Sequence, residues 1–591
     1  MPLLGCAGKG ASTPEPVQVT TRVDATNGSS PVGANAPPDA ITVQVRSESG
    51  APVSGAVIAF MRNAEDTLPS TVTADARGQA TIRSSSETEV TAVNATGFGR
   101  AKVIPGSALP VLIVLDGHCT QFEGTIEDQS APAGRASIET VHFFPYGTSA
   151  PAAFSARIDD ANRFQGCLPN GRYFADTELD EVGGGILFDV PSPSAIAYVG
   201  TRQSASQADA PNVGSPPATA SDVARSLPAN VGIVALGEST HGTAEYAVER
   251  ARFTLELAKS KRVRFVLLEA GLGDTLALDR YVRTGTGDVH KAVAALQFWM
   301  WDTEEFVKGV ELLRQYNKKR PARERIGFVG TDVQTTAGAV SYLLDDRSTS
   351  LSDAERTALS KVPDIDDSDW STVSEVDKRL VDDALARLAK PRRINDTRAL
   401  AAASIQSRLK LVGTGTGLNQ MRVRDQLMAD MAVRISDGGN QLSVVWAHMG
   451  HVARRYMFGQ DTMGTILGSR LGPRYVVLAM LSVSGSARAW DADFKIGVIP
   501  HTLTDAPPYA LERALAVEST EPSYVMFAQL SHEMQAWLSK LRYLRSIGGV
   551  YDPDGGFTLY DVGHAFDGVV VFRRTSSSTP TPTGIRKAKA Q

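Results

Sequence analysis

The sequence predicts a multidomain protein in which two N-terminal β-sandwich domains precede an α/β domain with a mainly parallel sheet and a large helical cap. A chain of 591 residues is too long for one hydrophobic core. Its first third shows short alternating strands separated by turns, whereas the remainder alternates buried apolar runs with amphipathic segments, the βαβ pattern of a parallel sheet. The net charge of −5 gives no reason to expect a nucleic acid or an anionic membrane surface as partner.

The start of the chain, residues 1–38, combines a lipobox-like tetrad with a flexible tether. Leu3, Leu4, Gly5 and Cys6 resemble the end of a bacterial lipoprotein signal, although no basic region and no long apolar region precede them. Residues 7–38 are rich in Gly, Ala, Ser, Thr and Pro, as flexible tethers are. We therefore expect an exported protein, periplasmic or at the cell surface, with Cys6 as the candidate site of a lipid anchor, and the sequence leaves open whether the native start lies upstream of Met1. Chance occurrence of the tetrad remains the alternative.

Two β-sandwiches are expected at 39–116 and 117–199. The turn at 52–55 together with Asp75 to Gly78 resembles the carboxypeptidase regulatory-like domains, and residues 117–199 repeat the plan more loosely. With Cys6 set aside, Cys119 and Cys167 are the remaining cysteines, so an oxidising compartment predicts a disulfide between them. The sandwiches are expected to act as spacers, with carbohydrate or partner binding as the alternative.

After a linker at 200–222, the α/β domain is expected at 223–575. Its predicted strands are 231–236, 264–270, 326–332, 442–448 and 474–482. The helical segment 338–440 is too long for one crossover, so we assign it to a cap over the carboxyl edge of the sheet. Residues 576–591 are expected to be a disordered tail.

Polar titratable residues recur where these buried strands end. Parallel strands share a direction, so their carboxyl ends lie on one edge of the sheet, where α/β proteins place their chemistry. Each such residue alone is more often a helix cap or a solvated loop residue, but recurrence at successive strands favours a site. The residues are Glu238, His241, Glu269, Asp332, His448 and His451.

The stretch from Gly237 to Gly242, Gly-Glu-Ser-Thr-His-Gly, resembles the Gly-Glu-x-x-His-Gly signature of the erythromycin esterase family. Six later blocks resemble that family in its order, so the resemblance covers about residues 221–575. They are LLEA at 267–270, FWMW with TEEF at 298–306, GTDVQ at 330–334, RVRDQLMADM at 422–431, WAHMGHVARR at 446–455 and HAFDGVVVFRR at 564–574.

The resemblance implies catalytic roles for four residues. His241 would be the general base that takes a proton from water, and Glu238 would position it or the water. Glu269 would complete the acidic side of the pocket, and Arg250 would supply positive charge, although a solvated helix arginine is its ordinary role.

The same resemblance implies substrate contacts. His448 and His451 match the paired histidines of the family and would bind or polarise the substrate. The aromatic block at 298–301 is either an apolar wall for a large substrate or helix core. The expected substrate-binding residues are His448, His451, Trp299, Trp301 and Asp332.

Three alternatives remain beside this reading. Ser239 partly imitates a nucleophile elbow, but His241 stands where the second glycine of that motif belongs, so we disfavour a serine nucleophile. A metal-dependent hydrolase would use His241, His448, His451, Glu238 and Glu269 as ligands. A non-catalytic surface binding protein would use the same fold without chemistry.

The sequence thus predicts a hydrolase of the erythromycin esterase type that acts on a small-molecule ester or lactone. Macrolides are implied by the family resemblance. We expect no cofactor and no nucleic-acid partner, and the sequence leaves the oligomeric state open.

Overall fold

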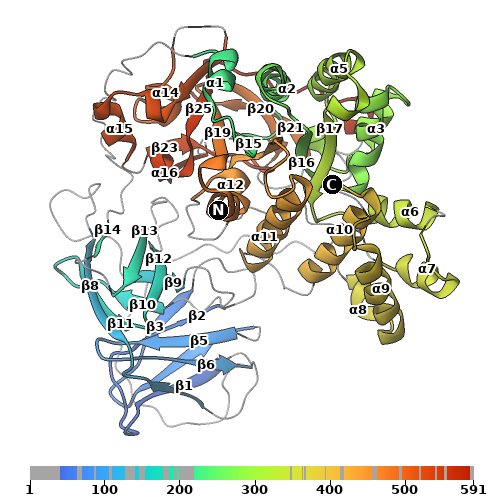
Figure 1. Cartoon of the computed structure of the whole chain (residues 1–591). Coiled ribbons are helices and arrows are strands. Elements are labelled where there is room, and N and C mark those ends of the chain that lie inside the picture. The colour runs from blue at the N-terminus through green and yellow to red at the C-terminus, as the bar shows by residue number, and fades with distance from the viewer. Residues whose placement is uncertain are drawn as a thin grey trace.

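The computed structural model separates a strand-rich N-terminal region from an α/β region (Figure 1). The structure describes residues 40–62, 69–85, 88–104, 110–126, 140–145, 154–177, 186–191, 196–198, 218–346, 349–362, 364, 368–392, 395–412, 418–455, 462–491, 496–517, 519, 521–539, 542–551 and 556–585. Cys6 and the tether therefore lie outside the described residues.

The first strand-rich unit consists of two facing sheets. One has the order β4 (Gln79–Arg83), β1 (Ala40–Ser47), β7 (Val111–Leu115). The other has the order β3 (Ser70–Thr73), β2 (Val57–Phe60), β5 (Thr88–Val93), β6 (Phe98–Val103). Because side chains alternate along a strand, Ile41, Val43 and Val45 of β1 all point into one core.

The second strand-rich unit also has two sheets, as expected for a second sandwich. Their orders are β10 (Phe154–Arg157), β9 (Thr140–Pro145), β12 (Gly171–Thr177), β13 (Ile186–Val190), and β11 (Arg163–Leu168), β8 (Thr120–Ile126), β14 (Ile196–Tyr198). Cys119 and Cys167 form the predicted disulfide, with a Cα separation of 5.4 Å. Phe98 of the first unit meets Phe154 of the second edge to face, with ring centroids 5.8 Å apart.

The α/β region is built on a seven-stranded sheet. Its order is β17 (Gly327–Asp332), β16 (Phe265–Gly271), β18 (Ser443–His448), β15 (Ile233–Glu238), β19 (Tyr475–Ser482), β25 (Gly568–Phe572), β22 (Ser523–Met526). All five predicted strands are present, and β25 joins them in parallel, whereas β22 pairs with β25 in the antiparallel sense. The sheet is therefore mainly parallel, as the sequence predicts.

Both faces of the sheet are covered, which explains why its strands lack polar alternation. On β15, Val234 and Leu236 pack into the core that contains α2 (Ala244–Ser260) and α5 (Glu304–Lys318). Ile233 and Ala235 face the opposite core. Every residue of β15 is buried. In the described part of the chain, no helix is both long and apolar enough to cross a bilayer.

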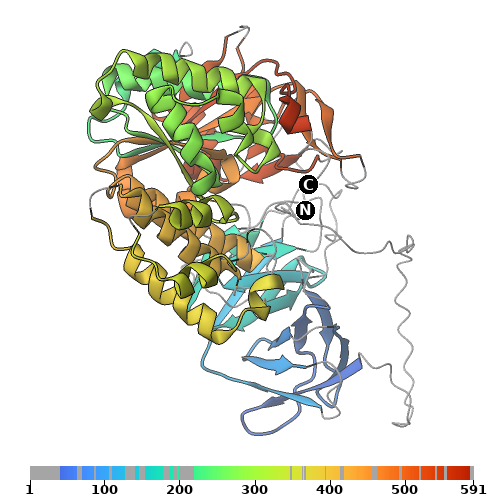
Figure 2. The same cartoon turned by 90° about the vertical axis from the view of Figure 1, so that its right-hand side faces the viewer.

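Between residues 337 and 435 the described elements are all helices, as predicted, and they form a group to one side of the sheet (Figure 2). The helices are α6 (Ala337–Asp345), α7 (Asp353–Leu359), α8 (Ser368–Thr372), α9 (Glu375–Leu388), α10 (Thr397–Val412) and α11 (Leu418–Ile435). The last of them, α11, packs beside β17 and reaches the carboxyl ends of the central strands. The helix α1 (Ala220–Ser226) begins within the stretch expected to be linker.

Two further features flank the end of β15. They are two hairpins, one of β20 (Gly485–Trp490) with β21 (Val498–Leu503) and one of β23 (Arg542–Arg545) with β24 (Phe557–Tyr560). Ile547, which follows β23, forms a β-bridge with Thr240 in the turn after β15.

Residues 576–585 were expected to belong to a disordered tail, and this expectation is wrong for them. Their Ser, Thr and Pro composition is typical of tails, but their backbone is hydrogen-bonded to the starts of α2 and α5.

Candidate active site

The turn that follows β15 needs both glycines of its Gly-Glu-x-x-His-Gly pattern. A Cβ on Gly237 would lie 2.5 Å from Cγ2 of Val452 and 2.7 Å from Cα of Met449, because α12 (Met449–Val452) crosses directly over the strand. Gly242 has a φ of +62°, and a Cβ there would lie 2.5 Å from the carbonyl oxygen of Arg488. The two glycines thus allow the close packing that holds Glu238 and His241 between them.

Glu238, the last residue of β15, is shared by two partners. Its Oε1 lies 2.6 Å from Nδ1 of His241, and its Oε2 lies 2.9 Å from Nη1 of Arg250. Arg250 is itself fixed, because its Nη2 donates to the carbonyls of Leu236 at 3.2 Å and Ala447 at 2.7 Å. A buried guanidinium therefore neutralises the carboxylate that orients His241, the arrangement that buried charges require.

The hydrogen bond to Glu238 sets the tautomer of His241. Nδ1–H donates to the carboxylate, so in the neutral ring Nε2 carries a lone pair and can accept a proton. Among the described residues, no group hydrogen-bonds to this Nε2. The ring lies 5.1 Å from that of His448 and 6.3 Å from that of Trp299, between centroids.

His448 is held as a neutral imidazole. It is the N-cap of α12, where its Nδ1 accepts the amide of Gly450 at 3.2 Å. Burial, and then the neighbouring ring of His241, lower the pKa of His448 to about 3. The single proton of the ring is therefore on Nε2.

This Nε2–H of His448 is buried and has no hydrogen-bond partner of good geometry among the described residues. The backbone carbonyl of Ser239 favours the protonated form of the same ring, but that oxygen already accepts the amide of Ile547 at 2.7 Å. A buried donor without a partner is uncommon and marks a place where an acceptor could bind.

Glu269, at the end of β16, joins the neighbouring strand ends. Its Oε2 accepts the backbone amide of His448 at 2.8 Å, and its Oε1 lies 3.0 Å from Nη2 of Arg424 and 3.3 Å from Nε2 of His451. Burial alone would raise its pKa, but the charges of His451 and Arg424 hold the pKa of Glu269 well below its usual range. Glu269 is therefore ionised and bound on both oxygens.

Arg424 on α11 was not singled out from the sequence. Its Nε donates to Oδ1 of Asp332 at 3.0 Å and its Nη2 to Oδ2 at 2.7 Å, so the helix is joined to the end of β17 by a two-point contact. The signal that could have found it is the RVRDQLMADM block, which contains Arg424 and Asp425 and matches the family without offering a role for either residue.

His451 is the positively charged histidine of the cluster. Its Nδ1 lies 2.8 Å from Oδ1 of Asp425, which also accepts the amide of Met463 at 2.9 Å. Burial opposes protonation, but the carboxylates of Asp425 and Glu269 raise the pKa of His451 to about 10. Nε2 of this imidazolium donates toward Glu269, so its 3.2 Å separation from Nη1 of Arg424 is a contact between two donors. The two histidines of the His448-x-x-His451 pair thus have opposite protonation states.

The two tryptophans proposed as a substrate wall lie in different surroundings. Trp301 is buried in the core, its Nε1 donates to the carbonyl of Glu269 at 2.8 Å, and Arg250 lies over its ring. Trp301 is therefore part of the buried core that supports Glu269 and Arg250, and its ring is not available to contact a substrate. Trp299 packs with Trp490 and Val498 in a small apolar cluster beside His241.

Ser239 is turned away from this chemistry. Its side chain is fully buried, and Oγ lies 3.1 Å from the hydroxyl of Tyr246. The most exposed side chains of the cluster are those of His451 and Arg424, at 12%, and His241, at 10%. Solvent thus reaches the site from the side on which His241 and His451 lie.

The five residues of the metal alternative do not fit a metal ion. Guanidinium groups occupy the positions next to the carboxylates, Arg250 on Glu238 and Arg424 on Glu269, and His451 is protonated on both nitrogens. A metal would have to displace these cations from a buried site.

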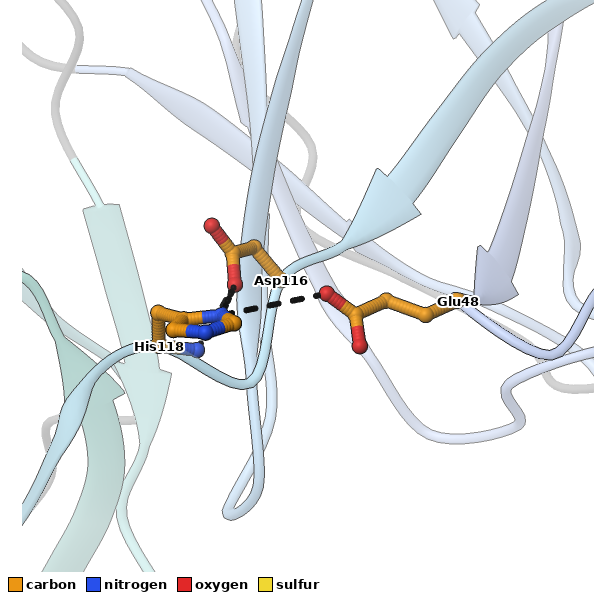
Figure 3. Close-up of side chains that lie close together, drawn as sticks. All are labelled: Glu48, Asp116 and His118. Atoms are coloured by element: carbon orange, nitrogen blue, oxygen red, sulfur yellow. Dashed lines mark hydrogen bonds and ion pairs between the residues drawn. The ribbon is translucent and has the colours of Figure 1, made fainter.

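Among the described residues, one group of side chains does converge as metal ligands could, far along the chain from these strands. Figure 3 shows Glu48, Asp116 and His118 in the first strand-rich unit. His118 is already hydrogen-bonded to Asp116 at 2.8 Å, and its ring is 87% exposed. This exposed cluster is unrelated to the strand ends.

Comparison with known proteins gives one family and several similar folds. The family model described as erythromycin esterase matches residues 259–575, a range that begins after the Gly237 to Gly242 turn. A protein from Bacillus cereus has a TM-score of 0.53 and 20% identity, over 63% of this chain and 96% of that one. A succinoglycan biosynthesis protein has a TM-score of 0.52 and 21% identity, over 59% and 89%. An erythromycin esterase variant in its open conformation has a TM-score of 0.42 and 15% identity, over 59% and 92%.

Proposed function

The chain belongs to the erythromycin esterase family, and on that premise we propose that it is a hydrolase in which His241 activates water to open an ester or a lactone. One observation carries the proposal: Nδ1 of His241 is hydrogen-bonded at 2.6 Å to Oε1 of Glu238. This bond leaves the lone pair of the neutral ring on Nε2, where it can accept a proton, which is the requirement for a general base.

In the attack step, the water oxygen bonds to the carbonyl carbon of the substrate, and one water proton passes to Nε2 of His241. The π electrons of the carbonyl move to its oxygen, which becomes an oxyanion. Nε2–H of His448 is the buried donor that supports this charge, since it has no partner of good geometry among the described residues.

In the collapse step, the oxyanion reforms the carbonyl and the bond to the leaving oxygen breaks. The imidazolium of His241 returns its proton to that oxygen, so an ester gives an acid and an alcohol and a lactone gives a hydroxy acid. Glu238 stabilises the transient imidazolium, and Arg250 keeps Glu238 in place.

A second group of residues holds the substrate side of the site. We assign His451, Arg424 and Asp332 to this role together with Glu269, because they form one ionic network at the solvent-facing side of the strand ends. The neutral His448 and the charged His451 offer two different hydrogen-bond donors. Trp299 contributes an apolar surface next to the base.

Water is the nucleophile in this proposal, and Ser239 is not. A serine nucleophile needs its oxygen exposed to the carbonyl and in contact with the base. Oγ of Ser239 is buried, and its hydrogen-bond partner is Tyr246.

The location of the protein is also a proposal. We infer that it is exported and carried on a lipid at Cys6, which the disulfide between Cys119 and Cys167 supports, because such bonds persist in oxidising compartments. Metabolic labelling with a radioactive fatty acid should mark the protein and fail with Cys6→Ser. Wild-type protein that takes up no label would contradict the lipid.

The substrate experiment is a panel of macrolides, aryl esters and simple lactones, incubated with wild type and with His241→Gln and analysed by mass. Products should gain one water, and the variant should form them far more slowly. A chelator arm separates the metal alternative, because turnover that a chelator abolishes and zinc or manganese restores would contradict water activation by His241 alone. If wild type turns over nothing in a broad panel, the proposed hydrolase fails and the binding-protein alternative gains.

A further inference from the structure

Residues 575–581, here termed the C-terminal strap, run across the turn that carries His241. The amide of Ser578 donates to the carbonyl of Gly242 at 2.8 Å, and the amide of Ala244 donates to the carbonyl of Ser576 at 2.9 Å. Thr243 and Ser577 form an antiparallel bridge between these bonds. The strap thus pairs with the backbone directly after the proposed base.

The same strap holds the start of α5. The amide of Glu304 donates to the carbonyl of Thr579 at 2.8 Å, and Oε2 of Glu305 accepts the amide of Thr579 at 2.8 Å. The hydroxyl of Thr581 donates to the buried carboxylate of Asp302. Asp302 directly follows the short turn that carries Trp299, so the strap links the segment of Trp299 to that of His241.

A third contact joins the strap to the β20–β21 hairpin. The amide of Ser486 donates to the carbonyl of Thr575 at 3.0 Å, and the amide of Ser577 donates to Oγ of Ser486 at 2.9 Å. Further along β20, the amide of Arg488 donates to the carbonyl of Gly242 at 3.1 Å. The carbonyl of Gly242 therefore accepts one hydrogen bond from the strap and one from the hairpin.

We propose that the C-terminal strap is a positioning element of the hydrolytic site, which fixes the His241 turn, Trp299 and the β20–β21 hairpin relative to one another. This inference rests on the proposed function, because the reaction gives the placement of His241 its meaning. The three joined segments are far apart in the sequence, and they bring His241 beside Trp299, and Trp299 beside Trp490.

The strap acts through geometry and not through charge. A single backbone hydrogen bond contributes only about 0.5–1.5 kcal/mol to stability. A small displacement of a general base, in contrast, can lower turnover by about a hundredfold, because the proton acceptor must meet the water within hydrogen-bond reach. Loss of a strap contact should therefore affect catalysis more than folding.

Position 578 offers a matched pair of variants. Ser578→Pro removes the amide that donates to Gly242, whereas Ser578→Ala keeps that amide and removes a hydroxyl that has no hydrogen-bond partner among the described residues. We expect Ser578→Pro to lower kcat at least about tenfold, with KM changed less. The acid limb of its pH profile should also move to lower pH, because a loosened contact with the Glu238 carboxylate stabilises the imidazolium of His241 less. Ser578→Ala should match wild type in kcat and in pH profile.

A second variant covers the case in which Ser578→Pro does not fold. Thr581→Val keeps the shape of the side chain and removes its donor to Asp302. It should lower kcat and shift the acid side of the pH profile in the same direction as Ser578→Pro. A purely structural role would lower the yield or the melting temperature and leave the pH profile of the folded protein unchanged.

A measurement without substrate separates the two proposals. The short Nδ1–H bond to Glu238 should give a far-downfield proton resonance in the NMR spectrum, which His241→Gln removes. The resonance should persist in Ser578→Ala and shift or broaden in Ser578→Pro and Thr581→Val. If wild type hydrolyses nothing, the proposed function fails, but this resonance still tests the strap. Retention of kcat, pH profile and resonance in both strap variants would overturn the inference.

Discussion

Arg424 and Asp332 meet in a two-point contact, with Nε 3.0 Å from Oδ1 and Nη2 2.7 Å from Oδ2. The contact joins α11 of the helical region to the end of β17, and Glu269 lies on the same guanidinium at 3.0 Å. Only a planar guanidinium reaches both oxygens of a carboxylate in this way. Arg424 therefore links α11 to β17 and, through Glu269, contacts the candidate site.

Arg424→Ala should lower the free energy of unfolding by about 3–5 kcal/mol, because it leaves Asp332 and Glu269 buried without their counter-charge. Arg424→Lys should recover part of this loss but not the two-point geometry, so its kcat/KM should stay below that of wild type. Urea denaturation and steady-state kinetics measure the two effects. Arg470→Ala, which removes a partly exposed ion pair with Asp430, is the control and should cost less than about 1 kcal/mol.

His241→Gln should lower kcat by about 10²–10⁴, the usual contribution of a positioned general base. Ser239→Ala should change kcat little, because its hydroxyl is buried against Tyr246. The two variants are compared on one substrate. An inactive Ser239→Ala, or an acyl group found on Ser239 by mass spectrometry, would contradict attack by water.

His448→Asn separates catalysis from helix capping. Asparagine is a good N-cap and can still accept the amide of Gly450, so stability should change by less than about 1 kcal/mol. The variant lacks the Nε2–H donor, so kcat should fall by about 10²–10³, as for removal of an oxyanion donor. Unchanged kcat would show that the donor of His448 does not act on the reacting carbonyl.

His451 predicts a loss of stability in alkaline solution. Its pKa is raised from 6.5 to about 10 in the folded protein, so its contribution is fully present below pH 6.5 and disappears as the pH rises toward 10. The free energy of unfolding of wild type should therefore fall more steeply between these pH values than that of His451→Gln. The exposed His532→Gln serves as the control and should keep the wild-type slope. Parallel curves for wild type and His451→Gln would show that His451 is not protonated in the folded state.

Cys167→Ala should destabilise the second strand-rich unit by about 2–4 kcal/mol, because it opens the link to Cys119. Unfolding followed by hydrogen exchange should locate the loss in strands β8 to β14. Hydrolytic activity should remain, since none of the residues assigned to catalysis lies in that unit. Two free thiols in protein purified without reductant would contradict the bond.

Much of the sheet and part of the site could be predicted from the sequence. The buried strands lack polar alternation and end in charged residues, so their positions were predicted to within about two residues and Glu238, His241 and Glu269 were identified with them. Hydrophobic patterns carry this information because both faces of the sheet are covered.

The remainder depends on contacts between segments that are far apart in the sequence. Arg424 meets Asp332 across 92 positions and Glu269 across 155, and no local pattern encodes such a pairing. Residues 575–581 have the composition of a tail, and their order comes from bonds to α2, α5 and β20. Trp301 shows the same limit, because an exposed aromatic wall and a buried aromatic core have identical local sequences.

The central position of β15 in the sheet determines which parts of the protein should unfold first. It is the fourth of seven strands, with β18 on one side and β19 on the other. Central strands are among the last parts of a protein to open, and their amides exchange hydrogen with solvent most slowly. Mild heat or low denaturant would therefore loosen other segments first and leave the backbone of Glu238 unaltered. Partial inactivation under such conditions should be reversible. The strand that ends in Glu238 would stay folded, so the loosened segments could refold against it.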